Sequence, residues 1–223
     1  MPKRFLFLQG VSSPFFAHLA DQLTAAGYSV FKVNFNCGDA AYWRLPGAWR
    51  FRDEVSSLAQ WLAAKLESHG FTDVVLFGDR RPIHIAAVEC ARRLGVTAHV
   101  FEEGYFRPNW ITLERGGVNR YSALPRDADW YLKNAPHFPE ETYQRVHTSL
   151  SVRAAHDIAY HLANLGNFIA YPGYHTHRPA NAVVEYAGLA RRFALLGVNE
   201  RRDKVICDRL VNEGKPFFLL PLQ

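Results

Sequence analysis

The apolar positions of the first hundred residues alternate between short continuous runs and helical periodicity. Residues 5–8 form a continuous apolar run, which is typical of a strand buried on both faces, and residues 29–35, 74–77 and 98–101 are also predicted to be strands. Between these runs, apolar residues recur at helical spacing over residues 16–23, 52–68 and 83–94. Strands that alternate with helices at this interval predict an α/β fold, a Rossmann-like parallel sheet flanked by helices.

Beyond residue 112 the alternation lapses. Residues 113–124 contain Gly116, Gly117 and Asn119, and they predict a long functional loop. Helical patterns return around residues 140–165, 182–196 and 200–211. The apolar segment 217–222 predicts one more buried strand, which either pairs into the first sheet or begins a second α/β domain.

Length and composition indicate a globular protein. The chain has 223 residues, 48% of them hydrophobic, enough for one full core or most of two small ones. No window approaches 18 consecutive apolar residues, and the apolar stretch after Arg4 is too short for a signal peptide. The three cysteines are far apart and lack paired metal-ligand spacing. We therefore expect a cytosolic protein without disulfides or structural zinc.

The charge balance indicates anionic partners. The formal net charge is +5 and the isoelectric point is about 9.2. The basic residues are dispersed in short pairs, and no recognisable nucleic-acid-binding motif accompanies them. We expect no nucleic acid, and a charged sugar, a nucleotide sugar or an anionic lipid head group accounts for the charge equally well.

Polar residues gather where the predicted strands end. In an open α/β sheet, ligands bind beyond the carboxyl ends of the strands. The candidates at this edge are Gln9 and Gly10, Asn34 or Asn36, Asp39, Asp79, Arg81, His84, Glu102, Glu103, Gly104 and Arg107. This set predicts a ligand-binding edge rather than a purely structural one.

The acidic pair Glu102-Glu103 is the most informative part of that edge. Successive side chains on an extended segment face opposite ways, so only one of the two is expected to enter the cleft. That carboxylate can act as a general base on a substrate hydroxyl, while Arg81 or Arg107 grips a carboxylate or phosphate. Solvated loop charges, or a network of Asp79/Arg107 or Glu103/Arg81 ion pairs that braces the loops, explain the same residues equally well.

Two further patterns bear on cofactors. No G-x-G-x-x-G or G-x-x-x-x-G-K-[ST] motif follows any predicted strand, so the fold prediction does not extend to a bound dinucleotide or nucleoside triphosphate. His175 and His177 resemble a metal pair, but no third ligand stands near them. Contacts to a sugar, or a packed interdomain loop, are the favoured interpretations, and we expect no metal.

Several motifs together resemble the capsular polysaccharide KpsS/KpsC family. They occur in the family's order over nearly the whole chain, at residues 7–10 with 13–16, 33–35 with 38–39, 77–79 with 81–82, 101–112, 116–119 and 177–179. The resemblance implies a glycosyltransferase of two Rossmann-like domains (GT-B type), cytoplasmic and peripheral to the inner membrane. Such enzymes transfer β-linked Kdo from CMP-Kdo, with retention and without a cofactor, to a phosphatidylglycerol-type lipid acceptor in capsule primer synthesis. Other capsule synthesis and export proteins are the expected partners.

The same hypothesis assigns roles to residues. Glu102, Glu103 and Asp79 are expected to act in acid/base chemistry or to orient the acceptor. Substrate contacts are expected from Gln9, Gly10, Asn34, Asp39, Arg81, His84, Gly104, Arg107, Asn119, His177 and Arg178. One departure lies next to this set, because Arg80 stands where the family pattern has a cysteine.

The resemblance also predicts a domain plan. We expect a Rossmann-like acceptor-side domain over residues 1–125, a helical extension over 126–215 and the first strand of a nucleotide-binding domain over 216–223. On this plan the donor site lies downstream, and the chain alone is expected to be inactive. The alternative function is a non-catalytic glycan- or glycolipid-binding subunit in capsule assembly or export, which needs no donor site.

Overall fold

The computed structural model describes residues 2–104, 110–138, 149–176, 182–214, 216 and 218. The chain divides into two compact units, residues 1–177 and 178–223. The predicted domain boundaries stay a prediction.

A six-stranded sheet forms the centre of the first unit. Its strand order is β3-β2-β1-β4-β5-β6, parallel except for the antiparallel pair β5 and β6. The strands are β1 (Arg4–Phe7), β2 (Ser29–Asn34), β3 (Ala48–Arg50), β4 (Asp73–Phe77), β5 (Thr97–Glu103) and β6 (Ile111–Arg115). A mostly parallel sheet flanked by helices confirms the predicted Rossmann-like α/β class.

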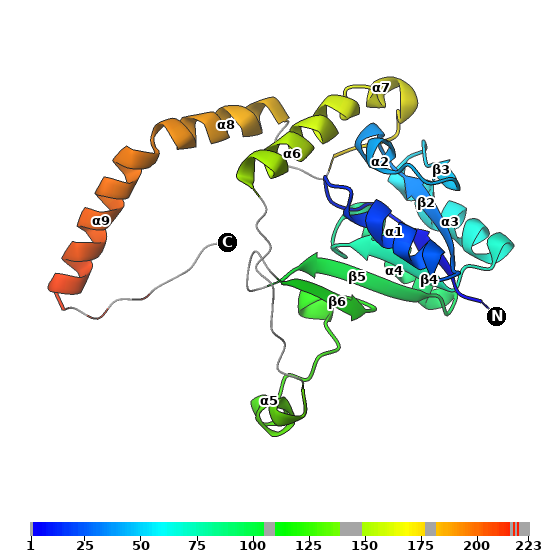
Figure 1. The fold of residues 1–223 in the computed structure, drawn as a ribbon, viewed down its shortest axis with the longest axis horizontal. Helices are drawn as coiled ribbons and strands as arrows, with labels where there is room; N and C mark the ends of the chain where they lie inside the picture. The colour runs from blue at the N-terminus through cyan, green and yellow to red at the C-terminus, as the bar shows by residue number, and fades with distance from the viewer. Residues whose placement is uncertain are drawn as a thin grey trace. The chain divides into compact units, whose positions relative to one another are not determined.

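Helices cover both faces of the sheet (Figure 1). On one face, α1 (Phe15–Ala25) packs on a cluster that includes Phe7, Phe77 and Phe101. On the other face, α3 (Val55–His69) and α4 (Pro82–Arg93) cover a cluster that includes Leu6 and Leu76. Successive strand residues point to opposite faces, so an apolar run such as residues 5–8 serves both clusters at once.

The prediction of a loop over residues 113–124 is wrong for its first three residues. Residues 111–115 form β6, which pairs with the end of β5 so that Thr112 lies opposite Glu102. The side chains of Ile111 and Leu113 are exposed, so this edge strand lacks the buried run that marks the other strands. The structure also adds β3 and α2 (Cys37–Tyr42), two short elements that the apolar pattern did not predict.

The later part of the first unit is mainly helical in the residues that the structure describes. After α5 (Ala128–Asn134), α6 (Leu150–Asn164) packs against α2 and is followed by α7 (Asn167–Ala170). Short 3₁₀ turns cover Asn119–Tyr121 and Ala135–His137. The helical pattern predicted over 140–165 is confirmed for residues 150–164, and residues 140–148 lie outside the described residues.

The described residues of the second unit contain the helices α8 (Ala182–Ala194) and α9 (Leu196–Asn212), as the helical patterns predicted. The strand predicted over 217–222 lies outside the described residues except for Phe218. Among the residues the structure describes, no helix is both long enough and apolar enough to cross a membrane.

The contact between α2 and α6 depends on a glycine. A Cβ atom built on Gly38 would lie 2.5 Å from the ring of Tyr160, which is buried in α6. We expect Gly38→Ala to lower the free energy of unfolding by about 1–3 kcal/mol, because the added methyl group overpacks a closed interface. Urea denaturation followed by tryptophan fluorescence measures this loss.

Gly188→Ala in α8 is the matched control. A Cβ atom at Gly188 meets no atom within 4 Å, and alanine favours a helix over glycine. This variant should leave the unfolding of the first unit unchanged. Equal destabilisation by both substitutions would contradict a specific role of Gly38.

Candidate functional site

Arg81 joins two loops at the point where the strand order reverses. The loop after β1 and the loop after β4 leave neighbouring parallel strands there, and this is where open α/β sheets bind ligands. The Arg81 Nη1 atom donates to Gln9 Oε1 at 3.0 Å and to the Gly10 carbonyl oxygen at 2.9 Å. Arg81 directly precedes Pro82, the first residue of α4, so the start of a rigid helix places it.

Only one nitrogen of the guanidinium group is used in these bonds. Among the described residues, Nη1 is the only Arg81 side-chain atom that makes a hydrogen bond, which leaves Nε and Nη2 available to a ligand. Burial lowers the pKa of Arg81, and the charges of Asp39 and Glu102 oppose that shift. Arginine stays protonated at such a site. The arrangement therefore presents a fixed cation at the switch point.

Asp39 is the buried acid behind Arg81. Its Oδ2 accepts from the Phe35 backbone N–H at 3.2 Å and from Gln9 Nε2 at 3.4 Å, and the Tyr160 hydroxyl lies 3.5 Å from its Oδ1. Burial raises the pKa of Asp39, and the positive charge of Lys32 opposes this shift. Gln9 is thus held by Asp39 at one end of its amide and holds Arg81 at the other.

Tyr160 brings α6 into the same network. Its hydroxyl oxygen accepts from Asn36 Nδ2 at 2.8 Å and from Gln9 Nε2 at 3.3 Å. Burial raises the pKa of this phenol, and the nearby Asp39 raises it further. Tyr160 therefore remains a neutral phenol that connects α6 to the ends of β1 and β2.

The amino terminus of α2 is closed by side chains. The backbone N–H groups of residues 37, 38 and 39 donate at 2.7–2.8 Å to the side-chain oxygens of Asn167, Asn164 and Asn36 respectively. Helix amino termini attract anions through unpaired N–H groups. Since the N–H groups of α2 are already bonded, this helix is not an anion site.

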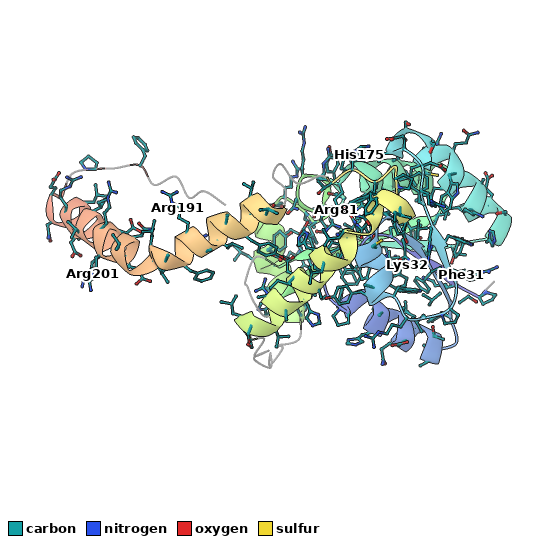
Figure 2. All side chains as sticks on the ribbon, turned by 90° about the horizontal axis from the view of Figure 1, so that it is seen from above. Phe31, Lys32, Arg81, His175, Arg191 and Arg201 are labelled. Carbon is teal, nitrogen blue, oxygen red and sulfur yellow. The ribbon has the colours of Figure 1, made fainter. Side chains whose placement is uncertain are left out.

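Lys32 adds a second buried cation. Its Nζ donates to the Leu8 carbonyl oxygen at 2.7 Å and to the Val33 carbonyl oxygen at 3.4 Å. Burial lowers the pKa of Lys32, and Asp39 opposes the shift. Figure 2 shows Lys32 and Arg81 within the first unit, in contrast to the exposed Arg191 and Arg201 on α8 and α9.

Asp79 and His84 brace loops. Asp79 is buried, and its Oδ2 accepts from the Val118 backbone N–H at 3.1 Å, which holds residues 116–119 against the end of β4. The His84 ring is fully buried with Nδ1 against the Gly78 carbonyl oxygen. Both side chains are buried and hold backbone segments at the end of β4, so they support the site without being exposed to a ligand.

The acidic pair lies within β5 rather than in the loop after it. Glu102 is half-buried and points toward the β4 side, since its Oε2 lies 3.5 Å from a Cβ position built on Gly78. Its Oε1 accepts from the Glu103 backbone N–H at 3.0 Å, while the Glu103 side chain is exposed. Glu102 is therefore the carboxylate nearer to Arg81.

The remaining predicted residues are scattered. Asn34 is buried at the end of β2, and Gly104 donates its N–H to the Trp110 carbonyl oxygen at 3.0 Å. Asn119 has a left-handed backbone with φ of 54°. Arg107, His177 and Arg178 lie outside the described residues.

The structure thus brings together one group of predicted residues: Gln9, Gly10, Asp39, Arg81 and Glu102. The Glu103/Arg81 pair is not among the ion pairs of the described residues, and the Asp79/Arg107 pair includes an undescribed partner. No group of three or more potential metal ligands occurs in the described part of the chain.

Sequence reasoning missed Lys32 and Tyr160. Lys32 could have been recognised, because it lies within the predicted strand 29–35, and a lysine in a buried strand needs a nearby hydrogen-bond acceptor. Tyr160 gave no such signal, since it lies 121 residues after Asp39 in an ordinary helical pattern.

Comparison with known proteins agrees with the motifs. A family model described as "Capsule polysaccharide biosynthesis protein" matches residues 72–223. The chain is 36% identical over 228 residues to "Capsule polysaccharide modification protein LipB" of Neisseria meningitidis serogroup A, covering 99% of the chain and 54% of that relative. It is 32% identical over 222 residues to "Capsule polysaccharide export protein KpsS" of Escherichia coli, covering 99% and 57%. The chain therefore spans about half the length of these relatives.

We expect Tyr160→Phe to destabilise the first unit by about 1–3 kcal/mol, because it removes the acceptor of Asn36 and Gln9 inside a buried network. Urea denaturation measures the loss. Tyr28→Phe is the matched control, since Tyr28 is 38% exposed and its ring contact with Phe5 survives the change. Equal effects of the two substitutions would contradict the network.

The raised pKa of Asp39 gives a pH-dependent prediction. A carboxyl group whose pKa is raised by folding contributes stability at low pH that is lost as the pH rises through the folded pKa. Relative to wild type, Asp39→Asn should therefore gain stability as the pH rises from about 4, the ordinary pKa of an aspartate, through the neutral range. Urea denaturation across this range measures the difference, and Asp21→Asn on the exposed side of α1 controls for the loss of one carboxylate. A difference that stays flat with pH would show that folding does not raise this pKa.

Proposed function

The chain belongs to the family of capsule polysaccharide biosynthesis proteins, and on that basis we propose that it forms the acceptor side of a Kdo transferase in capsule primer synthesis. The proposed reaction transfers Kdo from CMP-Kdo, with retention, to a phosphatidylglycerol-type lipid acceptor. The relatives that support this proposal are described as capsule polysaccharide modification and export proteins.

One observation carries the proposal. At the switch point, a cation fixed by two hydrogen bonds stands beside a half-buried carboxylate from the next strand. Arg81 offers Nε and Nη2 to a phosphate or carboxylate of the acceptor, and guanidinium groups bind such oxyanions with two parallel bonds. Glu102 is then placed to accept the proton of an acceptor hydroxyl.

The buried residues behind Arg81 support this chemistry without taking part in it. Gln9, Asp39 and Tyr160 hold the guanidinium in one orientation, and a site that is fixed before binding loses less entropy when the ligand arrives. Asp79, first considered for acid/base chemistry, is assigned here to positioning residues 116–119.

The donor site is proposed to lie in the part of the longer relatives that this chain does not cover. We further propose a protein at the cytoplasmic face of the inner membrane that works with other capsule synthesis and export proteins and needs no cofactor or metal. The excess of basic residues suits an anionic membrane surface and an anionic acceptor.

The second candidate function is a non-catalytic glycan- or glycolipid-binding subunit. It draws on the same fixed cation and requires no general base. Affinity for an anionic oligosaccharide that does not change when CMP-Kdo is added would favour it.

A transfer assay by mass spectrometry tests the proposal. This chain, and the same chain extended to the length of its relatives, are each incubated with CMP-Kdo and a phosphatidylglycerol-type acceptor. Product from the extended chain alone places the donor site outside residues 1–223. Product from neither chain, with acceptor binding intact, favours the binding subunit.

In the extended chain, we expect Glu102→Gln to lower turnover by about 10²–10⁴-fold, the usual contribution of a general base. Glu103→Gln is the matched control, because its side chain is exposed on the opposite side of β5. Both variants should keep the wild-type unfolding midpoint. Unchanged turnover of Glu102→Gln would remove this residue from the mechanism, and a larger loss in Glu103→Gln would exchange the two roles.

A further inference from the structure

A small cavity lies beneath the loop between β1 and α1. We propose that this cavity is an anion subsite that receives one oxygen of a carboxylate or phosphate group. Its wall is built by the β1–α1 loop, the first turn of α1, β2 and α2; the lining residues are Gly10, Val11, Ser13, Phe16, Ala17, Lys32, Asp39, Tyr42 and Trp43.

The amino terminus of α1 opens into this cavity. The N–H groups of Phe16 and Ala17 donate to no backbone or side-chain acceptor among the described residues, and both residues line the cavity. Pro14 at the N-cap has no side chain able to accept these bonds, and the first turn contains no acidic residue. Unpaired N–H groups and the helix dipole favour an anion at this end.

The Lys32 ammonium group lies in the same cavity wall, where burial lowers its pKa and the nearby Asp39 opposes that shift. Its ammonium group has three N–H donors, of which two are directed to the carbonyl oxygens of Leu8 and Val33. One donor remains, and Lys32 lines the cavity. The side chain is almost completely buried, so an anion that reaches it is screened little by solvent.

Trp43 gives the independent observation. This side chain is 7% exposed and lines the cavity, and its Nε1–H has no acceptor within the described parts of the chain. A buried donor without an acceptor costs about 1–3 kcal/mol, so a ligand that accepts from it is favoured. The residues of this cavity wall therefore carry three kinds of donor: backbone N–H groups, an ammonium group and an indole N–H.

The remaining polar groups in the wall do not compete for the ligand. The Asp39 carboxylate oxygens already accept from Phe35, Gln9 and Tyr160, and the Tyr42 hydroxyl donates to the His156 carbonyl oxygen at 2.9 Å. The enclosed volume is about 20 Å³, and a water-sized group needs roughly 10–15 Å³. The space therefore fits one oxyanion oxygen, with the rest of the ligand outside.

The ligand is either an acidic sugar, through its carboxylate, or a lipid or nucleotide, through its phosphate. This assignment deepens the proposed function, because both groups occur on the proposed substrates. Its test uses small anions and no transfer reaction, so the failure of one proposal leaves the other standing.

The test follows the indole Nε1–H signals of the five tryptophans by ¹H–¹⁵N NMR in the whole chain. Sodium chloride is replaced stepwise by sodium acetate or by sodium phosphate at constant ionic strength. We expect a saturable shift of the Trp43 signal, which is assigned from its loss in Trp43→Phe, while the other four indole signals stay in place. Saturation by acetate identifies a carboxylate subsite, and saturation by phosphate identifies a phosphate subsite.

Lys32→Met should weaken the response about tenfold or more, since it removes a charged donor at similar volume. Lys204→Met on the exposed surface of α9 is the matched control and should respond as wild type. An unmoved Trp43 signal, a common drift of all five indoles, or an unchanged response in Lys32→Met would overturn the proposal.

Thermal unfolding provides a second measurement that does not depend on the Lys32 variant. An anion that binds only the folded state raises the midpoint of unfolding by mass action. We expect the anion that saturates the NMR response to raise the midpoint of wild type more than that of Trp43→Phe. Equal increases in the two proteins would overturn the assignment of the indole N–H to the subsite.

Discussion

The burial of one carboxyl group, that of Asp39, constrains the arrangement of the whole edge of the sheet. A buried carboxyl group without hydrogen-bond donors is costly, so donors must come from whatever segments can reach it. They come from the end of β2, from the loop after β1 and from α6. Each donor fixes a segment that is distant in sequence. Gln9 connects Asp39 to Arg81. Its amide nitrogen donates to the Asp39 carboxyl group, and its amide oxygen accepts from the Arg81 guanidinium group. The orientation of the partly buried Arg81 side chain thus depends on the buried acid Asp39.

The same constraint decides which helix can receive an anion. Bringing Tyr160 to Asp39 presses α6 against α2, and the close approach leaves room only for a glycine at position 38. The neighbouring Asn164 and Asn167 then occupy the N–H groups at the start of α2. Of the helices that follow β1 and β2, α1 has first-turn N–H groups without an acceptor among the described residues, whereas those of α2 are bonded. The proposed anion subsite therefore lies at the start of α1.

The sequence predicts those parts of the fold that depend on local burial. Strands such as residues 5–8 and 74–77 are recognisable because both faces are apolar, and helices such as residues 82–93 because one face is. The strand at residues 111–115 was not recognisable, because it lies at the edge of the sheet and its apolar side chains Ile111 and Leu113 are exposed. In the candidate site, Gln9, Asp39, Arg81 and Glu102 were predictable because strand ends share one edge. Tyr160 was not, because helical periodicity reports which side of α6 is apolar and does not report what that side meets.

The anion subsite proposed at the β1–α1 loop does not depend on a glycine-rich motif. In dinucleotide-binding folds, glycines let backbone N–H groups of this loop approach a phosphate. Here Gly10 serves packing, since a Cβ atom at this position would lie 2.8 Å from the ring of Phe16, and its carbonyl oxygen rather than its N–H is used. A carbonyl oxygen attracts a cation, and Arg81 occupies it with one nitrogen while keeping two others available. On the proposed function, the arginine thereby turns a backbone acceptor into part of an anion-binding position. A neutral residue at position 81 would leave the Gly10 carbonyl oxygen without this donor, a dependence that a glycine-rich loop does not have.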